Sequence, residues 1–184
     1  MLTNKNYTIN DDILIFNPEI DTEHIDYNVS GLDVLCEMEK KHFWNQARLK
    51  FVQNYFNKFI KKDSKILEVG CGIGHIASNL EKQGYKNIHV SDIHVKGLKY
   101  AKSTNNLNKL YQFDLHKPPF EDEFDVICFF DVLEHLANDD LILRNIHKML
   151  KPGGKIILAV LASGSLDRNK SNIASEIWSQ ILSG

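Results

Sequence analysis

Cysteine is scarce in this sequence. Its 184 residues include only three cysteines, Cys36, Cys71 and Cys128. They are odd in number, lie far apart and form no C-x-x-C pair, which argues against both a disulfide framework and a zinc knuckle. We therefore expect reduced thiols.

Long hydrophobic runs are also missing. No apolar stretch approaches the roughly 20 residues that a membrane-spanning helix needs. The first residues, MLTNKNYTINDD, show no basic segment followed by an apolar core, which a secretory signal peptide would have. The sequence therefore predicts a cytoplasmic protein that does not use a membrane as a partner.

Charge of one sign is not in excess either. The 22 Lys and Arg residues and 24 Asp and Glu residues give a net charge of −2, so the chain as a whole does not attract nucleic acid. The hydrophobic share of 43% and the charged share of 25% are ordinary for a globular protein. A chain of this length fits one folded unit with its own hydrophobic core.

The N-terminal third has a different pattern from the rest. Residues 1–30 are polar and predicted to be irregular, apart from a short apolar run at 13–16 that Asn17-Pro18 stops. From 33 to 60 the pattern is helical. One apolar stripe recurs there at steps of three and four residues, at Leu49, Val52, Phe56 and Phe59. We predict an N-terminal segment at 1–62 whose helix caps the ligand site, and a core at 63–184.

In that core, strands and helices alternate. Five short apolar strands are predicted, at 65–69, 88–91, 110–113, 124–130 and 155–161. Helices are predicted between them near 73–80, 95–102 and 139–150, with a turn at 151–154. This alternation predicts an α/β fold with three α/β/α layers around a doubly wound, mostly parallel sheet of order 3-2-1-4-5. Ligands bind beyond the carboxyl ends of such strands, where strands 1 and 4 are adjacent.

Acidic residues stand at the carboxyl ends of the first four predicted strands. They are Glu68, Asp92, Asp114 and Asp131. A single acidic residue after a strand is often only a helix cap. Four of them on the same edge of a parallel sheet, beside a glycine-rich loop, predict a ligand site.

The glycine-rich loop follows the first strand and allows two ligand classes. Gly70, Gly72 and Gly74 form a G-x-G-x-G sequence, and His75 occupies the position where a dinucleotide fingerprint has its third glycine. Asp92 follows Gly70 by 22 residues, a spacing that suits a ribose in either class. A nicotinamide cofactor is thus disfavoured but not excluded, and the glycines could also serve only to make a tight turn.

The segment ILEVGCGIGHIASNL at 66–80 resembles motif I of the class I S-adenosylmethionine-dependent methyltransferases, which have an acidic residue two positions before G-x-G-x-G. The resemblance extends in order through Asp92, FDL at 113–115, FDVICFFDVLEHL at 124–136 and LKPGGKIILAV at 150–160. EKKHFWNQARLKFV at 39–52 resembles a helix before motif I in one bacterial branch of these enzymes. The resemblance implies a Rossmann-like methyltransferase fold, S-adenosyl-L-methionine as cofactor and S-adenosyl-L-homocysteine as product.

The resemblance also implies roles around the methionine part of the cofactor. Gly70, Cys71 and Gly72 would let the backbone approach it where a side chain would clash. Glu68 would lie in reach of the cofactor's ammonium group. A carboxylate there is favourable because this cofactor carries an ammonium and a sulfonium but no phosphate.

The adenosine part is assigned to residues that follow the next strands. Asp92 would bind the ribose hydroxyls, and Ile93 would lie against the adenine. Asp114 would accept a hydrogen bond from the adenine amino group, and Leu115 would donate its backbone N–H. Phe130, at the end of the fourth strand, completes this set of cofactor-binding candidates.

The helix at 33–60 supplies two further cofactor-binding candidates. Arg48 would pair with the cofactor carboxylate, because a guanidinium matches a carboxylate through two hydrogen bonds. Trp44 would close over the cofactor. A solvated helix arginine and a core aromatic residue remain the alternative interpretations of these two side chains.

The candidate catalytic residues follow the fourth strand. Methyl transfer from a sulfonium depends mainly on alignment with the acceptor, but a hydroxyl acceptor must also lose a proton. His135 is the candidate base, and Asp131 is the candidate positioning group closer to the cofactor. The alternatives are a histidine that only packs at a helix start, or a metal site built from Glu134 and His135. No clear third ligand is present, so no metal is expected.

The C-terminal part departs from the family pattern. Only 23 residues follow Leu161, with a predicted helix at 173–182 and no strand pair, so the fold is expected to be C-terminally shortened. Strand 5 would then be a bare sheet edge, which that helix or the partner in a homodimer could cover. Three functions remain open: a methyltransferase for a small-molecule acceptor, a cofactor-binding module without catalysis, and a nicotinamide-dependent oxidoreductase.

Overall fold

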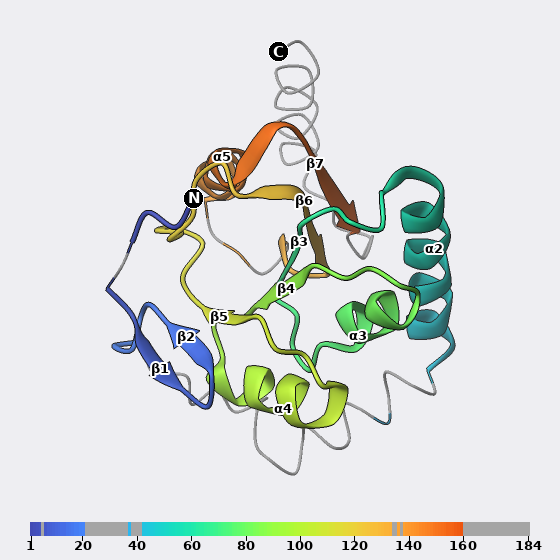
Figure 1. Cartoon of the computed structure of the whole chain (residues 1–184), viewed down its shortest axis with the longest axis horizontal. Helices are drawn as coiled ribbons and strands as arrows, with labels where there is room; N and C mark the ends of the chain where they lie inside the picture. The colour runs from blue at the N-terminus through green and yellow to red at the C-terminus, as the bar shows by residue number, and fades with distance from the viewer. Residues whose placement is uncertain (5, 21–36, 38–41, 134–135, 137, 160–184) are drawn as a thin grey trace.

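The computed structural model of the chain describes residues 1–4, 6–20, 37, 42–133, 136 and 138–159. These residues form one sheet with helices on both faces (Figure 1). The strands are β1 (Thr8–Asn10), β2 (Ile13–Ile15), β3 (Ile66–Val69), β4 (Ile88–Ser91), β5 (Leu110–Gln112), β6 (Phe124–Phe130) and β7 (Leu150–Ala159). The helices are α2 (Phe43–Phe59), α3 (His75–Lys82), α4 (Val95–Asn105) and α5 (Asp139–Met149).

The strand order confirms the predicted winding of the sheet. The order of all seven strands is β1-β2-β5-β4-β3-β6-β7, and its parallel part from β5 to β7 is the predicted 3-2-1-4-5. β3 pairs in parallel with β4 on one side and with β6 on the other, so Glu68 lies between Val90 and Cys128. β3 and β6 are therefore the adjacent strands at which the winding reverses.

The N-terminal hairpin corrects the prediction that residues 1–30 are irregular. β1 pairs antiparallel with β2, and β2 pairs in parallel with β5, with Ile13 opposite Leu110. Two strands from the predicted N-terminal segment 1–62 are thus part of the same sheet as the core. Each has only three residues, too few to show a strand period, and β2 pairs with a segment far along the chain. The local pattern could not indicate this pairing.

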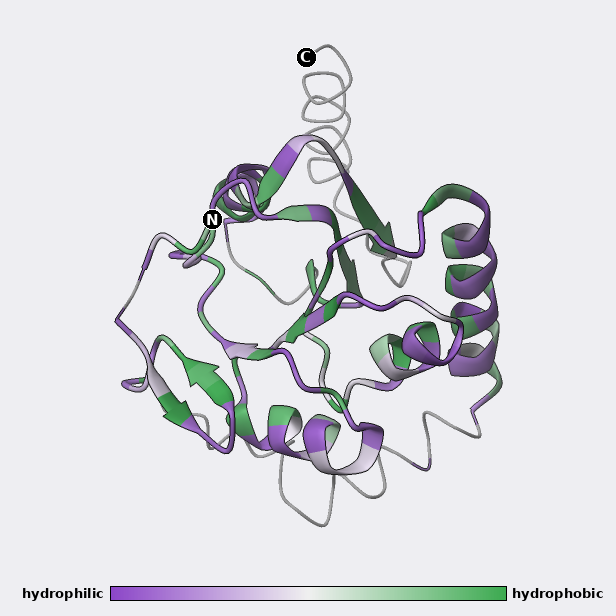
Figure 2. Cartoon of the chain, viewed as in Figure 1, coloured by the Kyte–Doolittle hydropathy of each residue, from purple (hydrophilic) through white to green (hydrophobic). Residues whose placement is uncertain are grey.

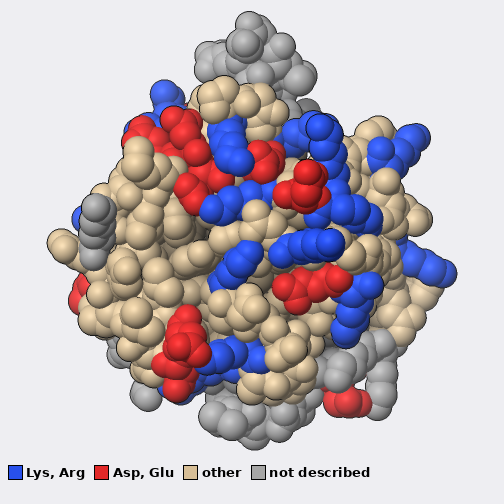
Figure 3. All heavy atoms as spheres, viewed as in Figure 1, with Lys and Arg blue, Asp and Glu red and all other residues tan. Residues whose placement is uncertain are grey.

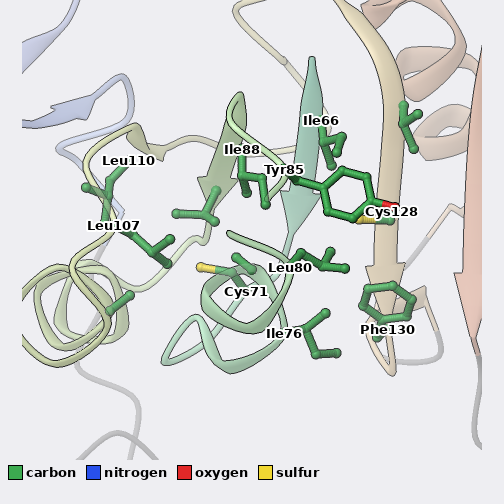
Figure 4. Packing of buried hydrophobic residues seen from close by; sticks show 14 of the residues in the cluster. Ile66, Cys71, Ile76, Leu80, Tyr85, Ile88, Leu107, Leu110, Cys128 and Phe130 are labelled. Carbon is green, nitrogen blue, oxygen red and sulfur yellow. The ribbon is translucent and has the colours of Figure 1, made fainter. Parts of the chain in front are cut away.

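One face of the sheet packs against α2, α3 and α4. The predicted inner face of α3 is confirmed, because Ile76, Ala77 and Leu80 are all buried. Figure 4 shows Ile76 and Leu80 of α3 beneath Ile66 and Ile88 of the strands. On α2, the ring of Phe56 lies edge-on to that of Tyr85, with centroids 5.5 Å apart. Full burial of side chains of this size contributes about 1.5–3 kcal/mol each.

The opposite face is covered by α5 and by an aromatic cluster. α5 buries Ile142, Ile146 and Met149, the three residues predicted for its inner face. Where the chain crosses from β5 to β6, the ring of Phe120 packs against those of Phe113 and Phe124. In Figure 2 the hydrophobic residues concentrate on the strands, while the helices alternate hydrophobic and hydrophilic around their axes. Hydrophobic strands covered by helices with one apolar side each are expected for a sheet that is buried on both faces.

Three element boundaries differ clearly from the sequence prediction. α2 begins at Phe43, after an extended His42, whereas the helical pattern is predicted from 33. α4 continues to Asn105 and ends at Asn106, whose φ of 61° is left-handed. β7 begins at Leu150 and includes the predicted turn 151–154, with a register shift opposite β6 between Phe124 and Val126. The shift lets the strand accommodate Gly153 at φ 76°.

Candidate functional site

The carboxyl ends of β3, β4, β5 and β6 bring the predicted acidic residues to one edge of the sheet, next to the glycine loop. This is the edge at which open parallel sheets bind ligands. The described residues of the site come from four consecutive strand ends and from α2.

The glycine loop has a backbone that only glycine adopts without strain. Gly70, Gly72 and Gly74 have φ values of 64°, 53° and 73°. A Cβ on Gly70 would lie 2.5 Å from Cγ2 of Val132, and one on Gly74 would lie 2.5 Å from Cδ1 of Leu107. The loop therefore needs glycine both for its conformation and for its close packing.

Asp92 holds the loop from the end of β4. Its carboxylate accepts the backbone N–H of Gly72 at 2.8 Å and that of His94 at 2.9 Å, and Cys71 N–H donates to the carbonyl of Ser91 at 3.0 Å. Burial raises the pKa of Asp92, against the lowering effect of these hydrogen bonds. A carboxylate has about four acceptor positions, so Asp92 keeps capacity for two ribose hydroxyls.

Glu68 connects the loop to the helix that follows it. It is buried on β3, and its Oε2 accepts the backbone N–H of Ala77, in the first turn of α3, at 2.9 Å. A negative charge is favourable at this end of a helix. Burial, together with the nearby Glu68, raises the pKa of the Cys128 thiol. The predicted contact of Glu68 with a ligand ammonium stays a prediction.

The predicted adenine contacts lie at the ends of β4 and β5. Ile93 and Asp114 are half-buried, and Leu115 is buried. The carboxylate of Asp114 accepts the backbone N–H of His116 at 2.9 Å and contacts its ring Nδ1 at 2.7 Å. Asn145 of α5 donates to the carbonyls of Leu115 and His116 at 2.9 and 3.0 Å, which fixes this turn from the α5 side.

Two residues that the sequence analysis did not select complete this region. The Asn17 side chain accepts the backbone N–H of Asp114 at 3.0 Å. Gln112 is fully buried; its amide oxygen accepts Asn17 N–H at 3.0 Å, and its amide nitrogen donates to the carbonyls of Asn17 and Ile93 at 3.1 and 3.4 Å. The only sequence signal was the end of the apolar run 13–16 at Asn17.

Arg48 and Asp131 form an ion pair across the site. Nη1 of Arg48 contacts Oδ2 of Asp131, and the two side chains are only 16% and 17% exposed. The Nε of Arg48 is buried and has no hydrogen-bond partner within the described part of the chain. The predicted contact of Arg48 with the cofactor carboxylate stays a prediction.

Of the remaining predicted site residues, the structure describes Phe130 but not the side chain of Trp44, nor Glu134 or His135. Phe130 is buried in the core against α3. Among the residues that are described, no three His, Cys, Asp or Glu side chains are grouped so that they could hold a metal ion.

The described site fits S-adenosyl-L-methionine. The carboxylate of Glu68 beside the glycine loop would repel a pyrophosphate but suits a cationic ligand, and Asp92 suits ribose hydroxyls. The close packing at Gly70 and the guanidinium of Arg48, paired with Asp131, frame this edge of the sheet.

Comparisons with known proteins give the same result. A family model described as a methyltransferase domain matches residues 38–179. A ubiquinone biosynthesis O-methyltransferase from Erwinia tasmaniensis is 27% identical over 139 residues, which is 72% of this chain and 56% of that protein. The methyltransferase GfsG from Streptomyces halstedii is 28% identical over 123 residues, covering 62% and 44% of the two chains. This chain thus spans about half the length of these curated relatives.

A solved structure supports the fold. A TehB-like SAM-dependent methyltransferase from Corynebacterium glutamicum superposes with a TM-score of 0.63 at 22% identity, covering 82% of this chain and 84% of that one. At this identity the likeness concerns the fold alone.

In the parts of the chain that the structure describes, no helix has both the length and the apolar character needed to cross a bilayer.

Proposed function

We propose that this chain, which belongs to the methyltransferase domain family, binds S-adenosyl-L-methionine at the carboxyl edge of its sheet and transfers the methyl group to a small-molecule acceptor. The cofactor follows from membership of the methyltransferase domain family and from the fold shared with a SAM-dependent methyltransferase. The transfer by this chain and the acceptor are the proposed parts.

The arrangement of Asp92 and Gly72 carries this proposal. Both oxygens of Asp92 are fixed by backbone N–H groups at 2.8 and 2.9 Å, so the carboxylate is oriented before any ligand arrives. The glycine loop that it holds is packed against Val132 and Leu107, which leave no room for a Cβ at Gly70 or Gly74. A preoriented acceptor pair costs little to reorganise on binding, which favours affinity for a ribose diol.

For the proposed chemistry, the protein must align the acceptor with the methyl group and provide one group that accepts a proton. When bound, S-adenosyl-L-methionine supplies a methyl group activated by its sulfonium. Arg48 would bind the carboxylate at the amino-acid end of the ligand. Asp131 would position groups where the cofactor meets the acceptor. His135 would take the proton of a hydroxyl acceptor as its oxygen attacks. The O-methyltransferase named among the relatives supports a hydroxyl acceptor.

A thermal-shift and calorimetry series tests the proposed cofactor. S-adenosyl-L-homocysteine should bind and raise the melting temperature, because a ligand of the native state stabilises it by mass action. At a concentration 100 times its Kd, the expected stabilisation is about 2.7 kcal/mol. Stabilisation by NAD, with none by S-adenosyl-L-homocysteine, would contradict the proposal. Binding of S-adenosyl-L-homocysteine without transfer to phenols, sugars or carboxylic acids would favour a binding module.

A further inference from the structure

The N-terminal hairpin is fastened to the core at its turn. Lys102 of α4 donates to the carbonyl of Asp11 and to the carboxylate of Asp12, both at 2.6 Å. Lys99 lies 3.0 Å from the carboxylate of Asp11. These contacts fix the turn between β1 and β2 near the amino end of β5, away from the ligand edge. Figure 1 shows the hairpin beside β5 and α4.

The other end of the hairpin reaches the ligand edge. After β2 pairs with β5, Phe16 N–H donates to the carbonyl of Gln112 at 2.9 Å. The chain then places Asn17 between the buried Gln112 side chain and the backbone of Asp114. The side-chain amide of Asn17 donates to Glu19 at 3.0 Å, so its oxygen is oriented towards Asp114 N–H.

From these contacts we infer that Asn17 is a positioning residue for the adenine side of the site. The inference rests on the proposed function, in which Asp114 accepts a hydrogen bond from the adenine amino group. Asn17 fixes the backbone of Asp114 through its N–H, and Gln112 links the same anchor to the carbonyl of Ile93. Asn17 and Gln112 therefore fix two of the three proposed adenine contacts, Ile93 and Asp114.

The effect of Asn17 should be specific to the base of the ligand. Removal of its side-chain oxygen leaves the N–H of Asp114 without its acceptor, so the turn and the carboxylate that follows can shift. A lost neutral hydrogen bond of this kind is worth about 0.5–1.5 kcal/mol, or roughly 2–10-fold in affinity. The ribose and methionine contacts depend on other strand ends and should be unaffected.

Calorimetry with two ligands tests this role. We expect Asn17→Ala to weaken S-adenosyl-L-homocysteine by roughly 2–10-fold. S-inosyl-L-homocysteine, which has no amino group for Asp114, should bind wild type and variant within about twofold. The ratio of the two affinities is the readout, because a loss of general stability would not change it.

Two matched variants separate positioning from folding. Glu19→Ala removes the other partner of the Asn17 side chain, and Lys102→Ala loosens the hairpin turn. Lys102→Ala should keep the wild-type affinity ratio even where it lowers the melting temperature. Glu19→Ala leaves the acceptor of Asp114 N–H in place, so it should change the ratio less than Asn17→Ala does. If Asn17→Ala weakens both ligands equally, or weakens neither, the affinity ratio does not change and the inference is overturned. If the wild type does not bind S-adenosyl-L-homocysteine, the proposed function fails and the inference fails with it.

Discussion

Two halves of the ligand edge are built differently. At the ends of β3, β4 and β5, backbone N–H groups and buried side chains hold Asp92 and Asp114 in place. At the end of β6, Asp131 forms an ion pair with Arg48, and Val132 packs against Gly70. In the first half, the acidic side chains are held from within the sheet itself. In the second half, the ion pair of Asp131 comes from α2, outside the sheet.

Replacement of His135 should have the largest effect and should separate the two halves. If it is the base, His135→Ala lowers methyl transfer to a hydroxyl acceptor by ~10²–10⁴-fold. The affinity for S-adenosyl-L-homocysteine should stay within a few-fold, because His135 itself is not among the proposed cofactor contacts. Single-turnover kinetics and calorimetry on the same preparations measure the two quantities.

His147→Ala is the matched control, because this histidine is exposed in the last turn of α5. It should leave both transfer and binding unchanged. Equal losses of transfer and binding in His135→Ala would assign His135 a structural role. Full transfer by that variant would remove it from the mechanism.

Gly70 is the point at which the two halves touch. Gly70→Ala places a Cβ at a φ of 64°, 2.5 Å from Cγ2 of Val132. The left-handed backbone costs about 1–2 kcal/mol and the overlap about 1–3 kcal/mol, so unfolding in urea should show a loss of about 2–5 kcal/mol.

Gly153 provides the control for this substitution. Its φ is 76°, but a Cβ there would meet nothing within 4 Å. Gly153→Ala should therefore show only the backbone cost, about 1–2 kcal/mol. Equal losses in the two variants would mean that Val132 moves away freely and that the halves are not packed against each other.

His89 tests the stability of the sheet away from the ligand edge. It is buried between Tyr111 and Phe124, with Nδ1 2.8 Å from the Tyr111 hydroxyl. Burial lowers the pKa of His89 from 6.5 to about 3, helped by the charges of Lys109 and Lys65 and opposed by that of Glu123. The neutral ring is thus required in the folded state.

The sign of the pH effect follows from this shift. Below pH 6.5 the unfolded chain binds a proton at His89 that the folded chain does not. The free energy of unfolding therefore decreases as the pH is lowered from about 6.5 to 3, by up to ~1.4 kcal/mol per pH unit. His89→Gln should lose this component and show a flatter profile, with wild-type affinity for S-adenosyl-L-homocysteine. Parallel pH profiles in the two proteins would contradict the assignment.

The features predicted correctly from the sequence are those with a local signal. The order of the parallel strands follows from their alternation with helices, and the place of Asp92 directly after a buried strand is seen at the end of β4. The inner faces of α3 and α5 follow from helical periodicity, through residues such as Leu80 and Ile146.

The features that were missed depend on contacts between distant segments. Asn17 and Gln112 act together only because β2 pairs with β5. Asn145 lies on the inner face of α5, where a polar residue gives no indication of the carbonyls that it binds. The partner of Arg48 could not be predicted either, because α2 and the end of β6 meet only in the folded chain.

A calorimetric titration of S-adenosyl-L-homocysteine into wild type, Asp92→Ala and Asp125→Ala tests the central claim most directly. Asp125 is the comparison because its carboxylate is equally engaged, with Lys65 N–H at 2.7 Å and Lys151 Nζ at 2.8 Å, but at the opposite end of the sheet. We expect Asp92→Ala to weaken binding by about 1–3 kcal/mol and Asp125→Ala to leave it unchanged. Wild-type affinity in Asp92→Ala, or an equal loss in both variants, would contradict a cofactor site at the end of β4.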